Sequence, residues 1–242
     1  SGSPIHLTTR SEFVKAIHTF EGAAFIVTEV ENIYVIYFII SKRDFVLSLP
    51  NCQTKQMPET YLQAQIFNRI SSLAKGEYEN CIFNNCHFAG NDLSGFKFTD
   101  CTFNSCNLSL AKLNKTALQD IKFKDCKMLG LRFDTCNEFG LSFSFDDCQL
   151  NHSSFYKTKI KKTIFKNSQL QETDFAEADL ASAVFDNCNL AQAIFDHTIL
   201  EKAALRTAYN YSIDPETNRV KKARFSISGL SGLLDKYDID IE

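Results

Sequence analysis

The chain has 242 residues, enough to bury a substantial core in one long domain or two short ones. Its 26 Lys and Arg residues against 29 Asp and Glu give a net charge of -3, too mild to indicate a nucleic-acid binder or an acidic tail. The apolar runs are much shorter than the roughly 20 residues that cross a bilayer. The nine cysteines, an odd number, argue against a secreted disulfide framework, so we expect a protein of the reducing cytoplasm.

Residues 1–56 show no sequence repeat. The segment TRSE at 9–12 has the form of a helix capping box, which predicts a short helix after it, reaching Phe20. Three apolar segments are predicted as strands, at 23–30, 33–40 and 45–49. Residues 1–56 are therefore either a small α+β or irregular segment, or sequence translated upstream of a start at Met57. Residues 57–80 are expected to form a lead-in and an N-terminal cap.

A period of five residues governs the chain from 81 to 227. Large apolar residues, which we call centres, recur first at Phe83, Phe88, Leu93, Phe98, Phe103, Leu108, Leu113, Leu118, Phe123, Met128 and Phe133. After a phase shift of two residues they continue at Phe145, Leu150, Phe155, Ile160, Phe165, Leu170, Phe175, Leu180, Phe185, Leu190, Phe195, Leu200 and Leu205. Two positions before most centres stands a small residue, such as Cys81, Thr116 or Ala183.

This period does not fit a helix, in which apolar residues recur every three or four positions. It does not fit a plain strand either, in which successive side chains point to opposite faces. Short strands with a corner in every pentad would return each centre to the interior, and stacked coils of that kind form a β-helix. Phe occupies every second centre from 145 to 195, so four sides per coil would stack Phe on Phe along two opposite walls. The predicted fold class is all-β, a quadrilateral β-helix.

Two segments interrupt the repeat. The phase shift lies within 134–144, where a bulge or projecting loop is expected. Within 209–222, Asn210 and Pro215 fall at centre positions, so this segment is expected to leave the coil. A partner would most readily recognise what breaks a regular, solvated surface. The candidate partner-binding residues are Asn137, Glu138, Phe139, Tyr209, Tyr211, Asp214, Glu216 and Arg219.

Residues 228–242 contain more apolar side chains than a solvated tail needs. The open end of a β-helix exposes strand edges that must be capped or paired. We therefore expect this segment to cap the helix and to join two copies through a two-fold interface. The residues expected at the interface are Leu230, Leu233, Leu234, Tyr237, Ile239 and Ile241.

The sequence contains no motif that indicates catalysis. The cysteines follow the repeat, at spacings of five or twenty, and not the close pairs of a zinc site, so we expect free thiols buried as small core residues. Asp146 and Asp147 would face opposite ways on a strand and could not act as an acid–base pair. An interior filled with Phe and Leu leaves no room for a small-molecule substrate. We expect no enzyme, no cofactor, no metal and no direct contact with nucleic acid or membrane.

The stretch FAEADLASAVFDNCNLAQAIF at 175–195 resembles the pentapeptide-repeat superfamily, whose consensus is A-(D/N)-L-x-x. The wider pattern is similar to its quinolone-resistance (Qnr-type) branch, in LAKGEYENC at 73–81, CKMLGLRFDTC at 126–136, TAYNYSIDPETNRVKKARFS at 207–226 and GLLDKYDIDIE at 232–242. The resemblance implies a right-handed β-helix of the bacterial cytoplasm that dimerises through its C-terminal end. It also implies binding to DNA gyrase or topoisomerase IV and protection of that enzyme from quinolone-type inhibitors, with the loops at 134–144 and 209–222 contributing.

Two functional hypotheses remain open. The first is a topoisomerase-binding, drug-protective protein that imitates duplex DNA, and the second is a generic interaction scaffold with an unrelated partner. An acidic stripe along one face would favour the first, because duplex DNA carries about one charge per 1.7 Å. A surface of mixed charge would favour the second.

Overall fold

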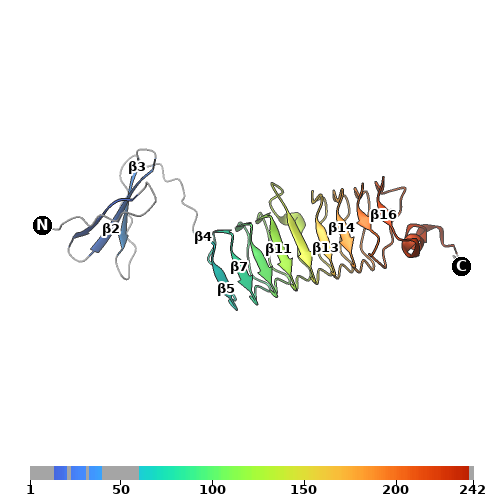
Figure 1. Ribbon diagram of the computed structural model, residues 1–242, viewed down its shortest axis with the longest axis horizontal. Helices are drawn as coiled ribbons and strands as arrows, with labels where there is room; N and C mark the ends of the chain where they lie inside the picture. Colours follow the sequence, from blue (N-terminus) through green and yellow to red (C-terminus); the bar gives the residue numbers. More distant parts are fainter. Residues whose placement is uncertain (1–13, 21–22, 31–32, 40–59, 240–242) are drawn as a thin grey trace. The chain divides into compact units, whose positions relative to one another are not determined.

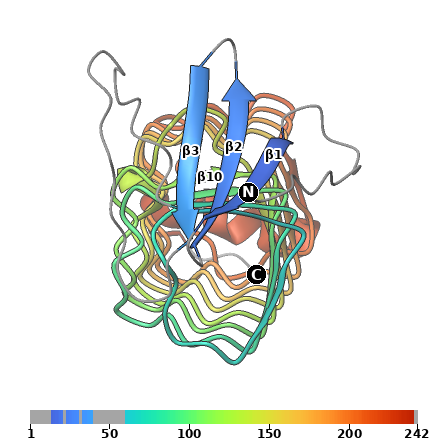
Figure 2. The same ribbon diagram turned by 90° about the vertical axis from the view of Figure 1, so that its left-hand side faces the viewer.

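The computed structural model describes residues 14–20, 23–30, 33–39 and 60–239, and the chain divides into two compact units, 1–55 and 56–242. The first unit contains an antiparallel sheet in the order β1-β2-β3 (Figure 2). Its strands are β1 (Val14–Phe20), β2 (Ala23–Val30) and β3 (Ile33–Ile39).

The strands predicted at 23–30 and 33–40 are confirmed, whereas the helix predicted after residue 12 is wrong over β1. Residues Val14, Ile17 and Thr19 favour extended backbone, and β1 pairs with β2 in the register Thr19 with Ala24. Pairing with a neighbouring strand therefore outweighs the local capping signal. That signal at 9–12 and the strand predicted at 45–49 lie outside the described residues.

The second unit is a parallel β-helix in which consecutive coils stack along the axis (Figures 1 and 2). One wall is a nine-stranded sheet of β5 (Ile66–Asn68), β7 (Ile82–Asn84), β9 (Thr102–Asn104), β11 (Ile121–Lys124), β12 (Phe143–Asp146), β13 (Ile164–Lys166), β14 (Val184–Asp186), β15 (Ala204–Leu205) and β16 (Arg224–Phe225). A second wall holds β4 (Tyr61–Gln63), β6 (Glu77–Glu79), β8 (Lys97–Thr99) and β10 (Ala117–Gln119). Short 3-10 helices are η1 (Phe133–Thr135), η2 (Ile227–Leu233) and η3 (Asp235–Tyr237).

Each coil of the regular part contains four pentads. Ile82 pairs with Thr102 and Ile164 pairs with Val184, and the stacked side chains of Asn84 and Asn104 are 20 residues apart. Between strands, a residue with positive φ turns the chain, as at Lys162. The turn in every pentad resets the alternation of sides, and the quadrilateral β-helix is confirmed.

The interior of the β-helix is filled by the predicted centres, every one of which is buried. The Phe165 ring stacks between Phe145 and Phe185, with centroid distances of 5.1 and 4.9 Å. The small residues two positions earlier are buried too. Where such a residue is Ser or Thr, its hydroxyl group can donate to a backbone carbonyl, as Thr116 Oγ1 does to the carbonyl oxygen of Leu93 at 2.8 Å. Small side chains at these positions leave room for the large centres, and the buried polar groups remain satisfied.

The first coil begins earlier than the sequence predicts. Tyr61 pairs with Glu77, and the stacked side chains of Asn68 and Asn84 are 16 residues apart, so this coil is four residues shorter than the others. Gly76 permits the tight return, because a Cβ there would lie 2.2 Å from the carbonyl oxygen of Thr60. The segment 57–80, expected as a lead-in and cap, thus contributes a coil from Tyr61 onward. The shortened coil hides it from a search for a period of five.

Replacing a centre should be far more costly than replacing its outward neighbour. Phe165→Ala should lower the free energy of unfolding by about 3–5 kcal/mol, because it leaves a cavity between two stacked rings. Lys166→Ala should change it by less than about 0.5 kcal/mol, because its ion pair with Asp146, at 3.7 Å, is exposed to solvent. Chemical denaturation followed by circular dichroism measures both, and similar losses in the two variants would contradict the assigned register.

Candidate partner-binding surfaces

The loop predicted at the phase shift is present. Ile121 pairs with Phe143, and Asp120 accepts a hydrogen bond from Ser142, 22 residues further on, so this coil contains two extra residues. The added length is taken up by a loop at 136–140, which projects from the wall between β11 and β12 (Figure 1). The Phe139 side chain at its tip is 79% exposed.

The backbone of this loop is fixed by hydrogen bonds even though its tip is exposed. The Asn137 amide donates to the carbonyl oxygen of Thr116 at 2.9 Å, and the Asn137 side chain accepts from the Phe139 amide at 3.0 Å. The Gln119 side chain donates to the carbonyl oxygen of Phe139 at 3.3 Å. Gly140 has a φ of +69°, and a Cβ there would lie 2.6 Å from Gln119 Nε2. The loop therefore carries an exposed aromatic ring on a backbone that is held in place, beside the exposed Glu138.

The segment 209–222 stays in the coil at both ends and leaves the parallel ladder between them: among the described residues, Ile194 pairs with Asp174 but not with Asp214. The excursion expected over the whole segment is confined to its middle. Tyr209 pairs with Asn189 and Arg219 with Ile199, so the 20-residue spacing continues through it. Asn210 and Pro215 are exposed, as their polarity and geometry require. The buried positions are filled instead by Tyr211, Ile213 and Asn218.

Asn218 is the residue that closes this coil, and the sequence analysis missed it. Its side-chain oxygen accepts from the Thr198 amide at 2.8 Å, and its side-chain nitrogen donates to the carbonyl oxygens of Phe195 and Asp214, both at 3.0 Å. These bonds let an amide occupy an inward position at which most coils have a small side chain. The sequence held only an indirect signal that the coil continues here: Phe225 lies 20 residues, one full coil, after Leu205.

Five of the predicted site residues lie in this segment. Tyr209 is 41% exposed, and the other four contact other parts of the chain. Tyr211 is buried and cannot reach a partner directly. Arg219 forms an ion pair of 2.6 Å with Glu201. Asp214 and Glu216 bind Lys236 Nζ at 2.8 and 2.6 Å.

These last contacts attach the C-terminal segment to the final coil. Hydrogen bonds from Lys236 hold the pKa values of Asp214 and Glu216 below their ordinary range, and the Tyr237 hydroxyl also donates to Glu216, at 2.9 Å. The Ile213 amide donates to the carbonyl oxygen of Gly232 at 2.8 Å. The segment therefore covers the end of the β-helix.

The residues predicted at a dimer interface separate into two groups. Leu233 and Leu234 are half-buried, and Leu233 packs against the core. Exposed apolar side chains on the outer side are Ile227 (90%), Leu230 (46%), Tyr237 (52%) and Ile239 (55%). Ile227 was missed because it lies one residue before the segment assigned to the interface, and Ile241 lies outside the described residues.

The cysteines of the described part are free, and all but the half-buried Cys136 are buried; Cys52 lies outside that part. Cys86, Cys106 and Cys126 form a column in which the Cys86 amide lies 3.4 Å from the Cys106 sulfur. Burial raises the pKa of the Cys188 thiol to about 12, which suppresses thiolate formation. Within residues 60–239, no group of three or more His, Cys, Asp or Glu side chains is placed to hold a metal ion.

Opposite charges on successive coils neutralise one another over much of the surface. The ion pairs that join neighbouring coils are Lys97–Glu77 (2.5 Å), Lys157–Glu177 (3.4 Å), Lys161–Asp179 (3.1 Å), Lys166–Asp146 (3.7 Å) and Arg219–Glu201 (2.6 Å). The outer faces therefore carry mixed charge. In the described part of the chain, no helix is both long enough and apolar enough to cross a membrane.

Repeated pentads, stacked four to a coil around a largely apolar interior, define this unit as a pentapeptide-type β-helix. The family model of the pentapeptide repeat region matches residues 76–144 and 141–208, more than half of the chain. The chain belongs to the pentapeptide-repeat family.

Several solved structures are similar to this chain at low sequence identity. Full-length QnrB1, described as a plasmid-mediated fluoroquinolone resistance protein, is 17% identical with a TM-score of 0.47 over 74% of this chain and 100% of that one. HetL, a pentapeptide repeat protein involved in heterocyst differentiation regulation in the cyanobacterium Nostoc, is 15% identical with a TM-score of 0.31 over 69% and 85%. Rfr23 from the cyanobacterium Cyanothece is 17% identical with a TM-score of 0.22 over 44% and 88%. No curated protein matches the chain.

A substitution at Asn218 tests whether 209–222 is part of the β-helix. Asn218→Ala should lower the free energy of unfolding by about 1–3 kcal/mol, because it leaves the buried Thr198 amide and Phe195 carbonyl without partners. Ser212→Ala, at an exposed position of the same segment, should stay within about 0.5 kcal/mol. Thermal and denaturant unfolding measure the difference, and a neutral Asn218→Ala would show that the coil does not depend on this side chain.

Proposed function

We propose that this chain is a non-catalytic protein-binding β-helix of the bacterial cytoplasm, whose partner contacts the loop at 136–140. The observation that carries the proposal is the Phe139 side chain, 79% exposed on a backbone held by the coils beneath it. Burying an aromatic ring on a backbone that is already held in place gains apolar contact without ordering the chain that carries it. Such residues commonly supply much of the energy of a protein interface.

The partner to test first is a type II DNA topoisomerase, gyrase or topoisomerase IV, and the expected consequence is protection from quinolone-type inhibitors. This choice rests on the resemblance of residues 73–242 to the Qnr-type branch. The proposal requires no small-molecule substrate, cofactor or direct contact with nucleic acid.

The alternative is an interaction scaffold with an unrelated partner. The ion pairs between coils favour it, because they leave mixed charge where a DNA mimic would need a continuous acidic stripe. Both hypotheses place the contact at irregular features of the surface. They differ in the partner alone.

Quinolone-induced DNA cleavage by gyrase and by topoisomerase IV tests the first hypothesis. Full-length protein should reduce cleavage, and Phe139→Ser should weaken that effect about tenfold or more, because an anchoring aromatic contributes upward of 1–2 kcal/mol. Leu110→Ser is the matched control: Leu110 is an apolar residue, 69% exposed, on a corner of the regular wall.

Circular dichroism must first show that all three proteins are folded. Equal loss in both variants would contradict a role for the loop. If the folded, unsubstituted chain neither protects a topoisomerase nor binds it, a topoisomerase partner is rejected and the scaffold hypothesis is left.

We also propose that two copies join through the C-terminal end. The support is the group of exposed apolar side chains on η2, η3 and the residues after them, chiefly Ile227 and Leu230. Light scattering should give twice the chain mass of 27.5 kDa. Ile227→Ser combined with Leu230→Ser should give a monomer, whereas Ile164→Ser, at a 48% exposed wall position, should not change the mass. A monomeric unsubstituted chain would refute the dimer.

A further inference from the structure

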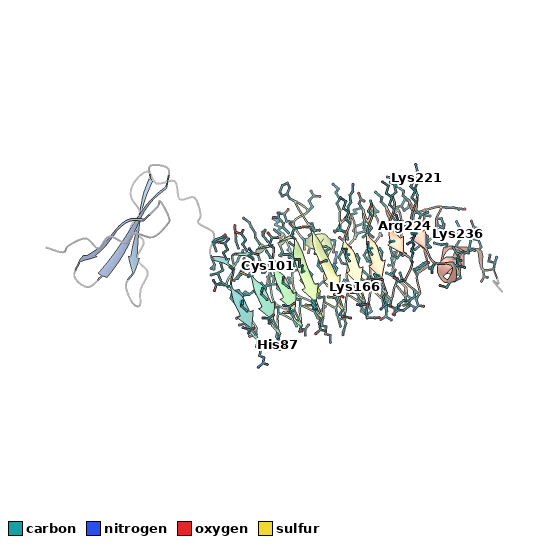
Figure 3. The ribbon with its side chains drawn as sticks, viewed as in Figure 1. His87, Cys101, Lys166, Lys221, Arg224 and Lys236 are labelled. Atoms are coloured by element: carbon teal, nitrogen blue, oxygen red, sulfur yellow. The ribbon has the colours of Figure 1, made fainter. Side chains whose placement is uncertain are left out.

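Cations accumulate on the outer face of the C-terminal half of the nine-stranded sheet, over β13 to β16. The residues of this cationic face are Lys162, Lys166, Lys202, Arg206, Lys222 and Arg224, all exposed. The backbones beneath them are stacked: the Lys162 amide donates to the carbonyl oxygen of Ala181 at 3.0 Å, and the Lys202 amide donates to that of Lys221 at 3.0 Å. Figure 3 shows Lys166 and Arg224 on this part of the molecule.

One corner of the β-helix accounts for the asymmetry. The corner leading into this sheet has Asn80, Asp100 and Asp120 in the N-terminal half of the stack. Beyond the loop at 136–140, the same corner has Lys162, Ser182, Lys202 and Lys222, all with positive φ. The sign of the charge thus reverses along a single edge.

This face departs from the charge pairing used elsewhere on the chain. Several other cations form ion pairs with an acidic side chain on a neighbouring coil, as Lys157 does with Glu177 and Lys161 with Asp179. Lys202 is instead followed by Lys222 on the next coil, roughly 4.8 Å along the axis. Among the residues that the structure describes, Lys162, Lys202, Arg206, Lys222 and Arg224 form no ion pair. Neighbouring like charges repel, and an anionic partner would relieve that repulsion.

An apolar strip lies inside the cationic face. Ile164, Val184 and Ala204 occupy successive coils in paired register, each two residues after its corner residue. Ile164 is 48% exposed, and the other two are half-buried. The face therefore combines a flat aliphatic centre with positive charge along one side, from Lys162, Lys202 and Lys222 at the corner. On the other side of the strip, Lys166 and Arg206 alternate with Asp146 and Asp186.

We propose that this face binds an acidic segment of a partner protein, whose carboxylates contact the cations while an apolar side chain covers Ile164. Charge complementarity selects an anionic occupant. A polypeptide fits better than nucleic acid, because the outward positions of these strands hold Ile, Val and Ala where a nucleic-acid surface would offer aromatic rings for stacking. The inference does not depend on the identity of the partner at the Phe139 loop.

Binding of a fluorescent peptide of alternating Glu and Val to the full chain tests the proposal, with a peptide of alternating Lys and Val as the charge-reversed control. The acidic peptide should bind, and more weakly as salt rises. The triple variant Lys202→Gln, Lys222→Gln, Arg224→Gln should bind it about tenfold more weakly or worse, because three charge contacts are lost. Gln is compatible with these corners, since Gln192 already occupies one with a φ of +58°.

The matched control is the triple variant Lys112→Gln, Lys115→Gln, Lys127→Gln, which removes the same charge from exposed positions on other walls. It should bind the acidic peptide within about twofold of the unsubstituted chain, because its cationic face is intact. Val184→Thr should also weaken binding, because it makes the strip polar at nearly constant shape. Equal losses in the two triple variants would reduce the effect to net charge and overturn the proposal. Tighter binding of a 20-base-pair DNA duplex, or no binding of the acidic peptide at low salt, would overturn it too.

Discussion

Backbone hydrogen bonding between successive coils is the interaction on which the rest of the structure depends. Each coil donates its amides to the carbonyls of the next, as from Lys162 to Ala181, so a residue stacks on the one a full coil away. Inward side chains then form continuous, buried columns of Phe, Leu or small residues. Outward side chains form columns as well. The same register that builds the core therefore decides which charges and which apolar groups meet on the surface.

The sequence predicted the core well because a corner in every pentad keeps every centre inside, and because the alternation of Phe and Leu centres favours four sides per coil. It failed where a local signal competed with pairing or where the period was hidden. The helix expected before Phe20 is a strand because β2 supplies a partner that the chain order alone does not reveal. The first coil escaped detection because it is four residues short. The segment 209–222 was expected to leave the coil because Asn210 and Pro215 fall at centre positions. The sequence did not reveal that the chain rejoins the coil at Asn218, whose buried side chain is satisfied by hydrogen bonds.

The candidate site was predictable to a similar degree. A phase shift is visible in the sequence, so the loop and its exposed Phe139 could be anticipated. The burial of Tyr211 and the use of Asp214 and Glu216 to hold Lys236 could not, because both depend on how the C-terminal segment folds back. The cationic face needed the stacking register itself: Lys162, Lys202 and Lys222 are far apart in sequence and become neighbours only when coils of known length are stacked.

The distribution of charge also limits how this chain could act on a topoisomerase. Duplex DNA presents a continuous negative field, whereas here Lys157 pairs with Glu177, Lys161 with Asp179, and the corner at Lys202 and Lys222 is positive. An enzyme surface that binds DNA is positively charged and would be repelled by the cationic face. Any such complex would have to be selected by shape and by the Phe139 loop and not by an overall negative charge. The loop ends at Ser142, in the same corner column as Lys162, so a partner at Phe139 would lie near the first cation of that edge and would need acidic groups there to avoid repulsion.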